Sequence, residues 1–200
     1  MANNKELYLV LSRTGTMLSN VIALFTQKEY SHVSISLDSS LTNMYSFGRI
    51  NPAKMLPAGF IKENVYDGVF AMFPKSKCLV YKLNVTDEQY ENLMIELDKF
   101  IKDNEKYKYS VKGLVFTYFN KPYKRDYYYF CSQFVSEVLI NSGIYKTDKK
   151  PELIKPMDLL DIEDKVLFYE GYANEEKFLE STNNLFIYNW LHKQKLRFRL

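Results

Sequence analysis

Strict alternation and short apolar runs mark strands in the first quarter of the chain. Residues 6–12 (ELYLVLS) indicate a buried strand. Residues 32–38 (HVSISLD) alternate strictly, which places His32 on the polar face of a strand whose other face is apolar. Residues 43–49 (NMYSFGR) follow after a polar turn, so we expect the two segments to form a hairpin.

Apolar residues at helical spacing follow in the middle of the chain. The segment after Thr86 carries a single apolar stripe, and Thr86 with Gln89 three residues later has the spacing of a capping box. Two further helices are predicted over 110–119 and 132–141, and Gly143 is placed to end the second one.

The remaining segments are shorter or more ambiguous. We expect a short helix over 17–26, a strand over 78–85, a short helix from Pro156 to Asp161 and a strand over 166–172. Prolines interrupt residues 50–74, which predicts irregular structure with one strand near 68–73. Residues 185–200 fit a helix and a strand equally. The order of elements predicts an α+β fold in which helices pack against an antiparallel sheet.

Composition and charge narrow the class of protein. The 200 residues are expected to form a single domain, 1–200, with a basic C-terminal extension from about residue 181. The last twenty residues hold four cations and no acid, so the body of the chain is close to neutral despite the net charge of +3. This argues against a nucleic-acid-binding body. The tail is a candidate for peripheral contact with an anionic membrane surface, although such ends are more often simply solvated.

Reactive side chains are few. The chain has two cysteines, Cys78 and Cys131, and two histidines, His32 and His192. None of their spacings matches a zinc motif, so neither a metal nor another cofactor is predicted. The N-terminus has no pattern of a signal peptide, and no apolar run is long enough to span a bilayer, so we expect a cytoplasmic chain with reduced thiols.

One thiol and one imidazole have the placement that nucleophilic catalysis requires. Cys131 lies where a helix is predicted to begin, and the positive end of the helix dipole favours the thiolate there. His32 lies on a polar strand face, where a base can reach a cleft. Cys78 opens a strand with no evident cleft, and His192 lies in the basic tail. On these patterns alone, a buried structural cysteine and a structural or surface histidine remain the commoner interpretation.

Two short motifs resemble a known family. The segment YSHVSISL (30–37) is similar to the histidine strand of the NlpC-type papain-like superfamily, and FCSQFVSEVL (130–139) is similar to its nucleophile helix. Here the histidine precedes the cysteine, which resembles the circularly permuted branch that includes the YiiX-like cysteine hydrolases and the lecithin retinol acyltransferase-like enzymes. The YiiX-like group is the closer match. The resemblance runs from about Glu6 to Asp161, and only the two motifs are specific.

The resemblance implies a small antiparallel sheet packed on the helix that bears the nucleophile. Cys131 would attack a carbonyl, His32 would accept and return the proton, and backbone N–H groups near Cys131 would hold the oxyanion. The family places a polar residue on the strand after the histidine strand to orient the imidazole. The matching stretch, 44–49, offers Ser46 and then Tyr45, and the register of the hairpin decides between them. Asp38 lies too far along its strand to serve.

Three functions are therefore weighed. The first is a thiol hydrolase or acyltransferase, an amidase, peptidase or lipid acyl hydrolase, that acts on a small-molecule, peptide or lipid substrate through a thioester. The second is a catalytically weak papain-like domain that binds lipid or peptide ligands, which the hydroxyl in place of a stronger third residue favours. The third is a lipid-facing protein, because many aromatic residues immediately precede Cys131, although such residues more often belong to a core.

Overall fold

The computed structural model describes residues 5–14 and 29–173. The helix expected over 17–26 and the basic extension from about 181 lie outside the described residues. The described strands are β1 (Lys5–Arg13), β2 (His32–Ser36), β3 (Met44–Arg49), β4 (Ala58–Glu63), β5 (Lys77–Val85), β6 (Lys108–Tyr109), β7 (Tyr128–Tyr129) and β8 (Lys165–Tyr172). The described helices are α2 (Gly68–Met72), α3 (Asp87–Lys102), α4 (Val111–Tyr118) and α5 (Cys131–Asn141), with short 3₁₀ turns at Asn104–Lys106, Pro151–Leu153 and Pro156–Asp161.

All eight described strands belong to one sheet, in the order β7-β6-β4-β3-β2-β1-β5-β8. Every neighbouring pair is antiparallel except β6 and β7, which are parallel, so the sheet is mixed. The α+β class is therefore confirmed, and the expectation of a purely antiparallel sheet is wrong at this one edge. The predicted hairpin is also confirmed, because β2 and β3 pair antiparallel with Ile35 opposite Tyr45.

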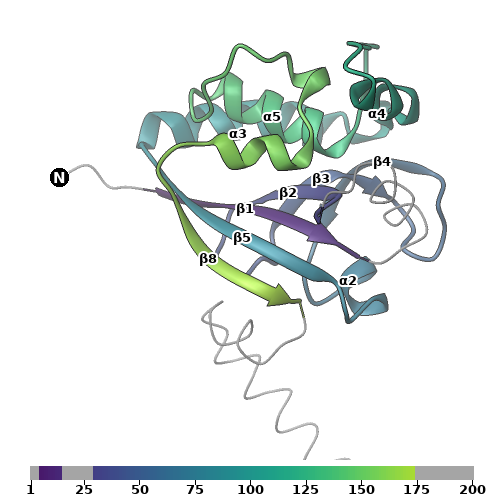
Figure 1. Ribbon diagram of the computed structural model, residues 1–200, viewed down its shortest axis with the longest axis horizontal. Helices are drawn as coiled ribbons and strands as arrows, with labels where there is room; N and C mark the ends of the chain where they lie inside the picture. Colours follow the sequence, from purple (N-terminus) through teal and green to yellow (C-terminus); the bar gives the residue numbers. More distant parts are fainter. Residues whose placement is uncertain (1–4, 15–28, 174–200) are drawn as a thin grey trace, which may run out of the picture.

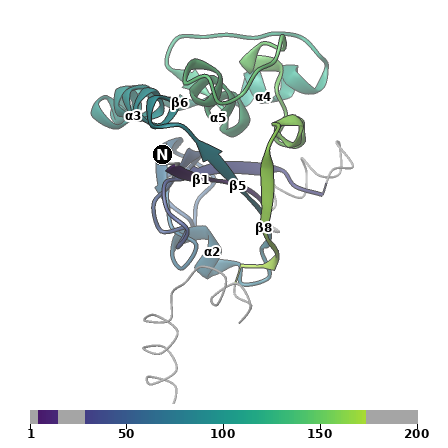
Figure 2. The same cartoon turned by 90° about the vertical axis from the view of Figure 1, so that its left-hand side faces the viewer.

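Side chains on the two faces of the sheet form two separate cores. Helices α3, α4 and α5 lie over one face, and α2 lies beneath the other (Figure 1; Figure 2). Alternate residues of β1 divide between the two cores: Leu7, Leu9 and Leu11 pack toward α3 and α5, whereas Tyr8 and Val10 pack into the opposite cluster. Strand β1 is thus buried on both sides, which explains its nearly continuous apolar sequence.

The residues predicted to begin α3 and to end α5 do so in the structure. The capping box at the start of α3 is present, with the Gln89 N–H donating to the Thr86 hydroxyl at 3.1 Å and the Thr86 N–H donating to the Gln89 side chain at 3.0 Å. Gly143 has a φ of 73°, so it follows α5 in the left-handed conformation expected of a residue that ends a helix. None of the described helices has the length and apolarity needed to cross a membrane.

The expectation for residues 50–74 is wrong in two places. The strand in this region is β4, which pairs with β3 from Met44 opposite Glu63 to Arg49 opposite Ala58. The expected strand near 68–73 is instead α2, which begins after Asp67, whose carboxylate accepts a hydrogen bond from the Gly68 N–H. Pro52 and Pro57 lie in the loop before β4, and Pro74 follows α2, so none of the three prolines lies within the strand.

Candidate active site

His32 and Cys131 meet between the sheet and the helix layer. His32 is the first residue of β2, and the preceding Ser31 N–H donates to the Ser12 carbonyl at 3.2 Å, which fixes the strand entry against β1. Cys131 is the first residue of α5, which packs across β2 and β3. The Cys131 side chain lies close enough to the imidazole to raise the pKa of His32, so two residues far apart in the sequence share one site.

Glu63, at the end of β4, holds the other side of the imidazole. The Nε2 atom of His32 lies 3.1 Å from both carboxylate oxygens of Glu63. Ser34 donates its hydroxyl to the same carboxylate and lies 3.3 Å from Nε2. The side chains of His32 and Glu63 are only 20% and 11% exposed, so water screens this ion pair poorly.

Charge and burial act against each other in this pair. Burial by itself lowers the pKa of His32, but the Glu63 carboxylate and the contact with Cys131 outweigh it, and the pKa lies well above the ordinary value of 6.5. Burial raises the pKa of Glu63, but the charge and hydrogen bond of His32, with the Ser34 hydroxyl, leave it below the ordinary value of 4.5. The arrangement therefore keeps an imidazolium beside a carboxylate at neutral pH.

Ser46 and Tyr45 do not orient His32. The Ser46 hydroxyl donates to the Val33 carbonyl at 2.7 Å and is fully buried. Tyr45 packs on the apolar core, where its ring stacks on Phe60 with 5.9 Å between centroids. The expectation that the third residue lies on the strand after the histidine strand is wrong, because the carboxylate reaches the ring from the next strand, β4. No sequence pattern marks Glu63, because the prolines in residues 50–74 indicate irregular structure there.

Glycine forms the floor of the site beneath the imidazole. A Cβ atom at Gly48 would lie 2.7 Å from the Ile61 side chain and 3.8 Å from Cε1 of His32. Any larger residue at this position on β3 must therefore displace a neighbour in the sheet. The bare backbone leaves room for the ring to lie against β3.

Two tyrosines lie on the Cys131 side of the site. Burial, followed by the charge of Cys131, raises the pKa of both Tyr109 on β6 and Tyr118 at the end of α4. Both phenols therefore stay protonated at neutral pH and are hydrogen-bond donors near the thiol. No sequence pattern marks these two tyrosines beyond the abundance of tyrosine in this region.

A cavity of about 280 Å³ opens beside His32 and Glu63. His32 and Glu63 contribute to its wall, together with Phe47 and Arg49 from β3 and Tyr109 from β6. Within residues 5–14 and 29–173, no three histidine, cysteine, aspartate or glutamate side chains gather in a way that could hold a metal ion. The arrangement offers a thiol, a charged imidazole, a carboxylate and an adjoining cavity.

Comparison with known proteins gives no relative. No family model, no curated protein and no solved structure matches the chain. The function of this chain is therefore inferred from the geometry of the site.

Proposed function

We propose that this protein is a cysteine hydrolase or acyltransferase that cleaves an amide or ester bond through a thioester on Cys131, within a circularly permuted NlpC-type papain-like fold. The observation that carries the proposal is the position of His32, which contacts the Cys131 thiol on one side and the Glu63 carboxylate on the other. The order of histidine strand and cysteine helix along the chain, and the packing of α5 on β2 and β3, support the same fold.

In the first step, the Sγ atom of Cys131 attacks the substrate carbonyl carbon while the imidazolium of His32 holds the thiol proton. Glu63 occupies Nε2, so the ring nitrogen available to the thiol is Nδ1. As the carbon–nitrogen or carbon–oxygen bond breaks, His32 gives this proton to the leaving amine or alcohol. The elevated pKa of His32 suits it to hold a proton until that moment.

In the second step, the thioester is resolved. The neutral imidazole left by the first step takes a proton from water in a hydrolase, or from an acceptor alcohol or amine in an acyltransferase. The resulting nucleophile attacks the thioester carbon, the carbon–sulfur bond breaks, and the proton returns to the Cys131 and His32 pair. Glu63 is a positioning residue: it holds the ring orientation and stabilises the imidazolium, which a hydroxyl such as that of Ser46 could not do as well.

The negative oxygen that forms in both steps requires hydrogen-bond donors. The first backbone N–H groups of α5 are suitable, because Phe130 precedes the helix and has no side chain that could accept from them. The protonated Tyr109 and Tyr118 are further donors on this side of the thiol. Each such donor contributes about 100- to 1,000-fold in rate in well-studied enzymes.

The proposal is tested by trapping the acyl intermediate. The full chain is incubated with p-nitrophenyl acetate, quenched in acid and digested, and the cysteine peptides are weighed by mass spectrometry. We expect an acetyl group on the Cys131 peptide of the wild type and of Cys78→Ala, and a much smaller yield in His32→Ala. Acetylation confined to Cys78, or equal yields with and without His32, would overturn the proposal.

A further inference from the structure

The cavity beside His32 suits an apolar group. Most of the residues around it are apolar, including Phe47, Ala58, Val69 and Leu114, and its polar residues are Thr14, Ser31, His32, Arg49, Glu63 and Tyr109. An apolar cavity of about 150 Å³ holds a benzene molecule, so this cavity has room for an acyl group of about ten carbon atoms.

Exposed apolar side chains surround the cavity mouth. Met55 and Leu56, from the loop between β3 and β4, and Val111, from α4, all line the cavity, yet each is more than half exposed. Val115 and Phe119 continue from Val111 at intervals of four residues and so lie on the same side of α4, and they are exposed as well. We call these five residues the rim. A contiguous exposed apolar surface of this kind marks an interaction site.

The two segments that carry the rim, 50–57 and 111–125, hold charges of one sign. Segments 50–57 and 111–125 contain no acidic residue, and their charged residues are Lys54, Lys112, Lys121, Lys124 and Arg125. All five are exposed, and none forms an ion pair with another residue in the part of the chain that the structure describes. Apolar side chains bordered by cations that form no ion pair are complementary to an anionic lipid surface, where the cations meet headgroups and the apolar side chains enter the acyl boundary.

The composition favours a membrane over a protein partner. Protein–protein interfaces are depleted in lysine, whereas four of these five cations are lysines. The apolar residues of the rim also continue directly into the cavity, so a single acyl chain can pass from a lipid layer to the side of His32.

We propose that the rim docks on an anionic membrane surface and that the substrate of the Cys131 site is a lipid ester or amide whose acyl chain enters the cavity. The substrate half of this inference rests on the proposed function. For an ester, the bond from Sγ to the acyl carbon forms, the carbon–oxygen bond breaks, and the thiol proton passes through His32 to the leaving alcohol. Water then cleaves the thioester, which restores the thiol and releases the fatty acid.

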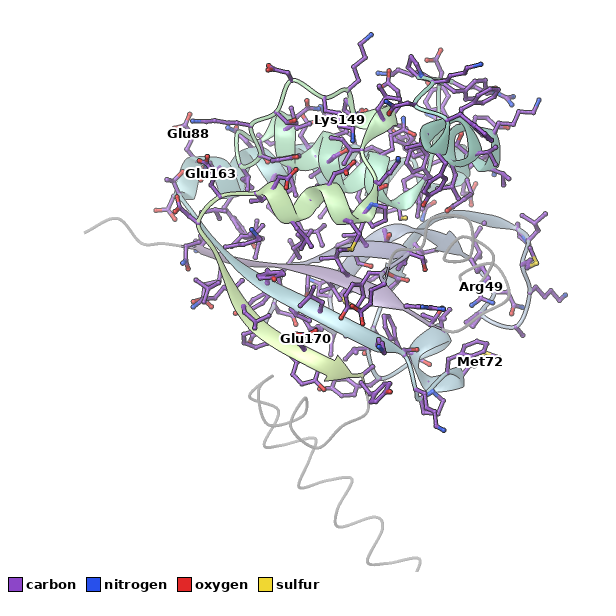
Figure 3. The ribbon with its side chains drawn as sticks, in the orientation of Figure 1. Arg49, Met72, Glu88, Lys149, Glu163 and Glu170 are labelled. Atoms are coloured by element: carbon purple, nitrogen blue, oxygen red, sulfur yellow. The ribbon has the colours of Figure 1, made fainter. Side chains whose placement is uncertain are left out.

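Docking is tested by co-sedimentation of the full chain with phosphatidylcholine vesicles and with vesicles that also contain phosphatidylserine. The rim variant is Leu56→Ser/Phe119→Ser, in which the two side chains are 65% and 70% exposed, so that folding is little affected. The matched control is Val166→Ser/Leu167→Ser, which removes two exposed apolar residues from β8 at the opposite edge of the sheet. In Figure 3, Arg49, which lines the cavity, lies away from Glu170, which belongs to the same strand as the two control residues.

We expect the wild type and the β8 control to sediment with the phosphatidylserine vesicles, and the rim variant to bind them about tenfold more weakly or worse, as the loss of one buried large apolar side chain predicts. Cys131→Ala should bind like the wild type. The docking inference is overturned if the wild type stays in the supernatant, if the rim variant binds normally, or if binding is lost only when residues 181–200 are removed.

The substrate half is tested separately with p-nitrophenyl esters of acetate and decanoate. We expect decanoate to acylate Cys131 faster than acetate does. Acylation by acetate alone would overturn the lipid substrate and leave the proposed function intact. If neither ester acylates Cys131 while the rim still binds vesicles, the proposed function itself fails.

Discussion

Cys131 and Cys78 are both free thiols that are almost completely buried, at 2% and 0% exposure. Cys131 begins a helix and contacts an imidazole that carries a proton. Cys78 lies within β5, opposite Ser12 of β1, and burial followed by the charge of Glu63 raises the pKa of its thiol to about 12. Burial is thus common to both residues and does not distinguish a nucleophile from a structural cysteine. The neighbouring charge distinguishes them: the His32 imidazolium acts on the Cys131 thiol, whereas the Glu63 carboxylate acts on the Cys78 thiol.

The largest expected effect on the alkylation of Cys131 comes from removing the His32 imidazolium. In His32→Ala, the rate of alkylation of Cys131 by iodoacetamide at pH 7 should fall by about 100- to 10,000-fold, the usual contribution of a positioned acid–base group. Cys78 should stay as unreactive as before, because its thiol depends on burial. Peptide mass spectrometry after timed quenching measures both rates in one sample. Unchanged labelling of Cys131 would show that the imidazole does not activate it.

Removing the Glu63 carboxylate should change the alkylation rates of Cys131 and Cys78 in opposite directions. In Glu63→Gln, His32 loses the carboxylate that raises its pKa, so Cys131 should be alkylated about tenfold more slowly at pH 7. Cys78 loses a charge that raises its own pKa, so its alkylation at alkaline pH should become faster. Labelling both cysteines across a pH series tests this. Parallel changes at the two sites would mean that the substitution had loosened the whole fold.

The ion pair between His32 and Glu63 predicts how the free energy of unfolding depends on pH. The pKa of His32 is raised on folding, so its contribution is complete below about 6.5 and is lost as the pH rises through the folded value. The pKa of Glu63 is lowered on folding, so its contribution is complete above about 4.5 and is lost as the pH falls through the folded value. The wild type should therefore exceed Glu63→Gln in free energy of unfolding by the most, about 2 kcal/mol, between these two values.

Urea titrations at pH 4, 5.5, 8 and 10 measure that difference. A gap between the two proteins that stays constant over the series would contradict the ion pair, because a loss of packing alone has no pH dependence.

The smallest effect is expected at Ser46. Ser46→Ala removes a buried hydrogen bond to the Val33 carbonyl and should lower the free energy of unfolding by about 1 kcal/mol. The ratio of the two alkylation rates should not change, since the hydroxyl is bonded to backbone and not to His32. A large fall in that ratio would restore Ser46 as the residue that orients the ring.

The two halves of the site differed in how far sequence could predict them. Helical spacing after Cys131 and strict alternation after His32 placed both residues at the starts of their elements, since these signals are local. Glu63 depends on which strands become neighbours in the sheet, and on a side chain that reaches His32 from two strands away. No local pattern encodes that, and the prolines of residues 50–74 indicate irregular structure where β4 forms.

Most of the fold was predictable from sequence because the signals for its elements are local. The strands β1, β2, β3, β5 and β8 and the helices α3, α4 and α5 follow from periodicity and end signals in their own residues. The parallel pairing of β6 with β7 was not predictable, because each strand has only two residues, too few to show a period. Their pairing depends on where α4 and α5 place the chain.

The most direct test of the central claim is an NMR titration of His32. The chain has only two histidines, so the ring signals are few, and His32→Ala assigns them. We predict that His32 in the wild type titrates well above pH 6.5, and that the midpoint falls in both Glu63→Gln and Cys131→Ala because each removes a group that raises this pKa. A midpoint near 6.5 that neither substitution moves would show that the carboxylate, the imidazole and the thiol do not act as one unit.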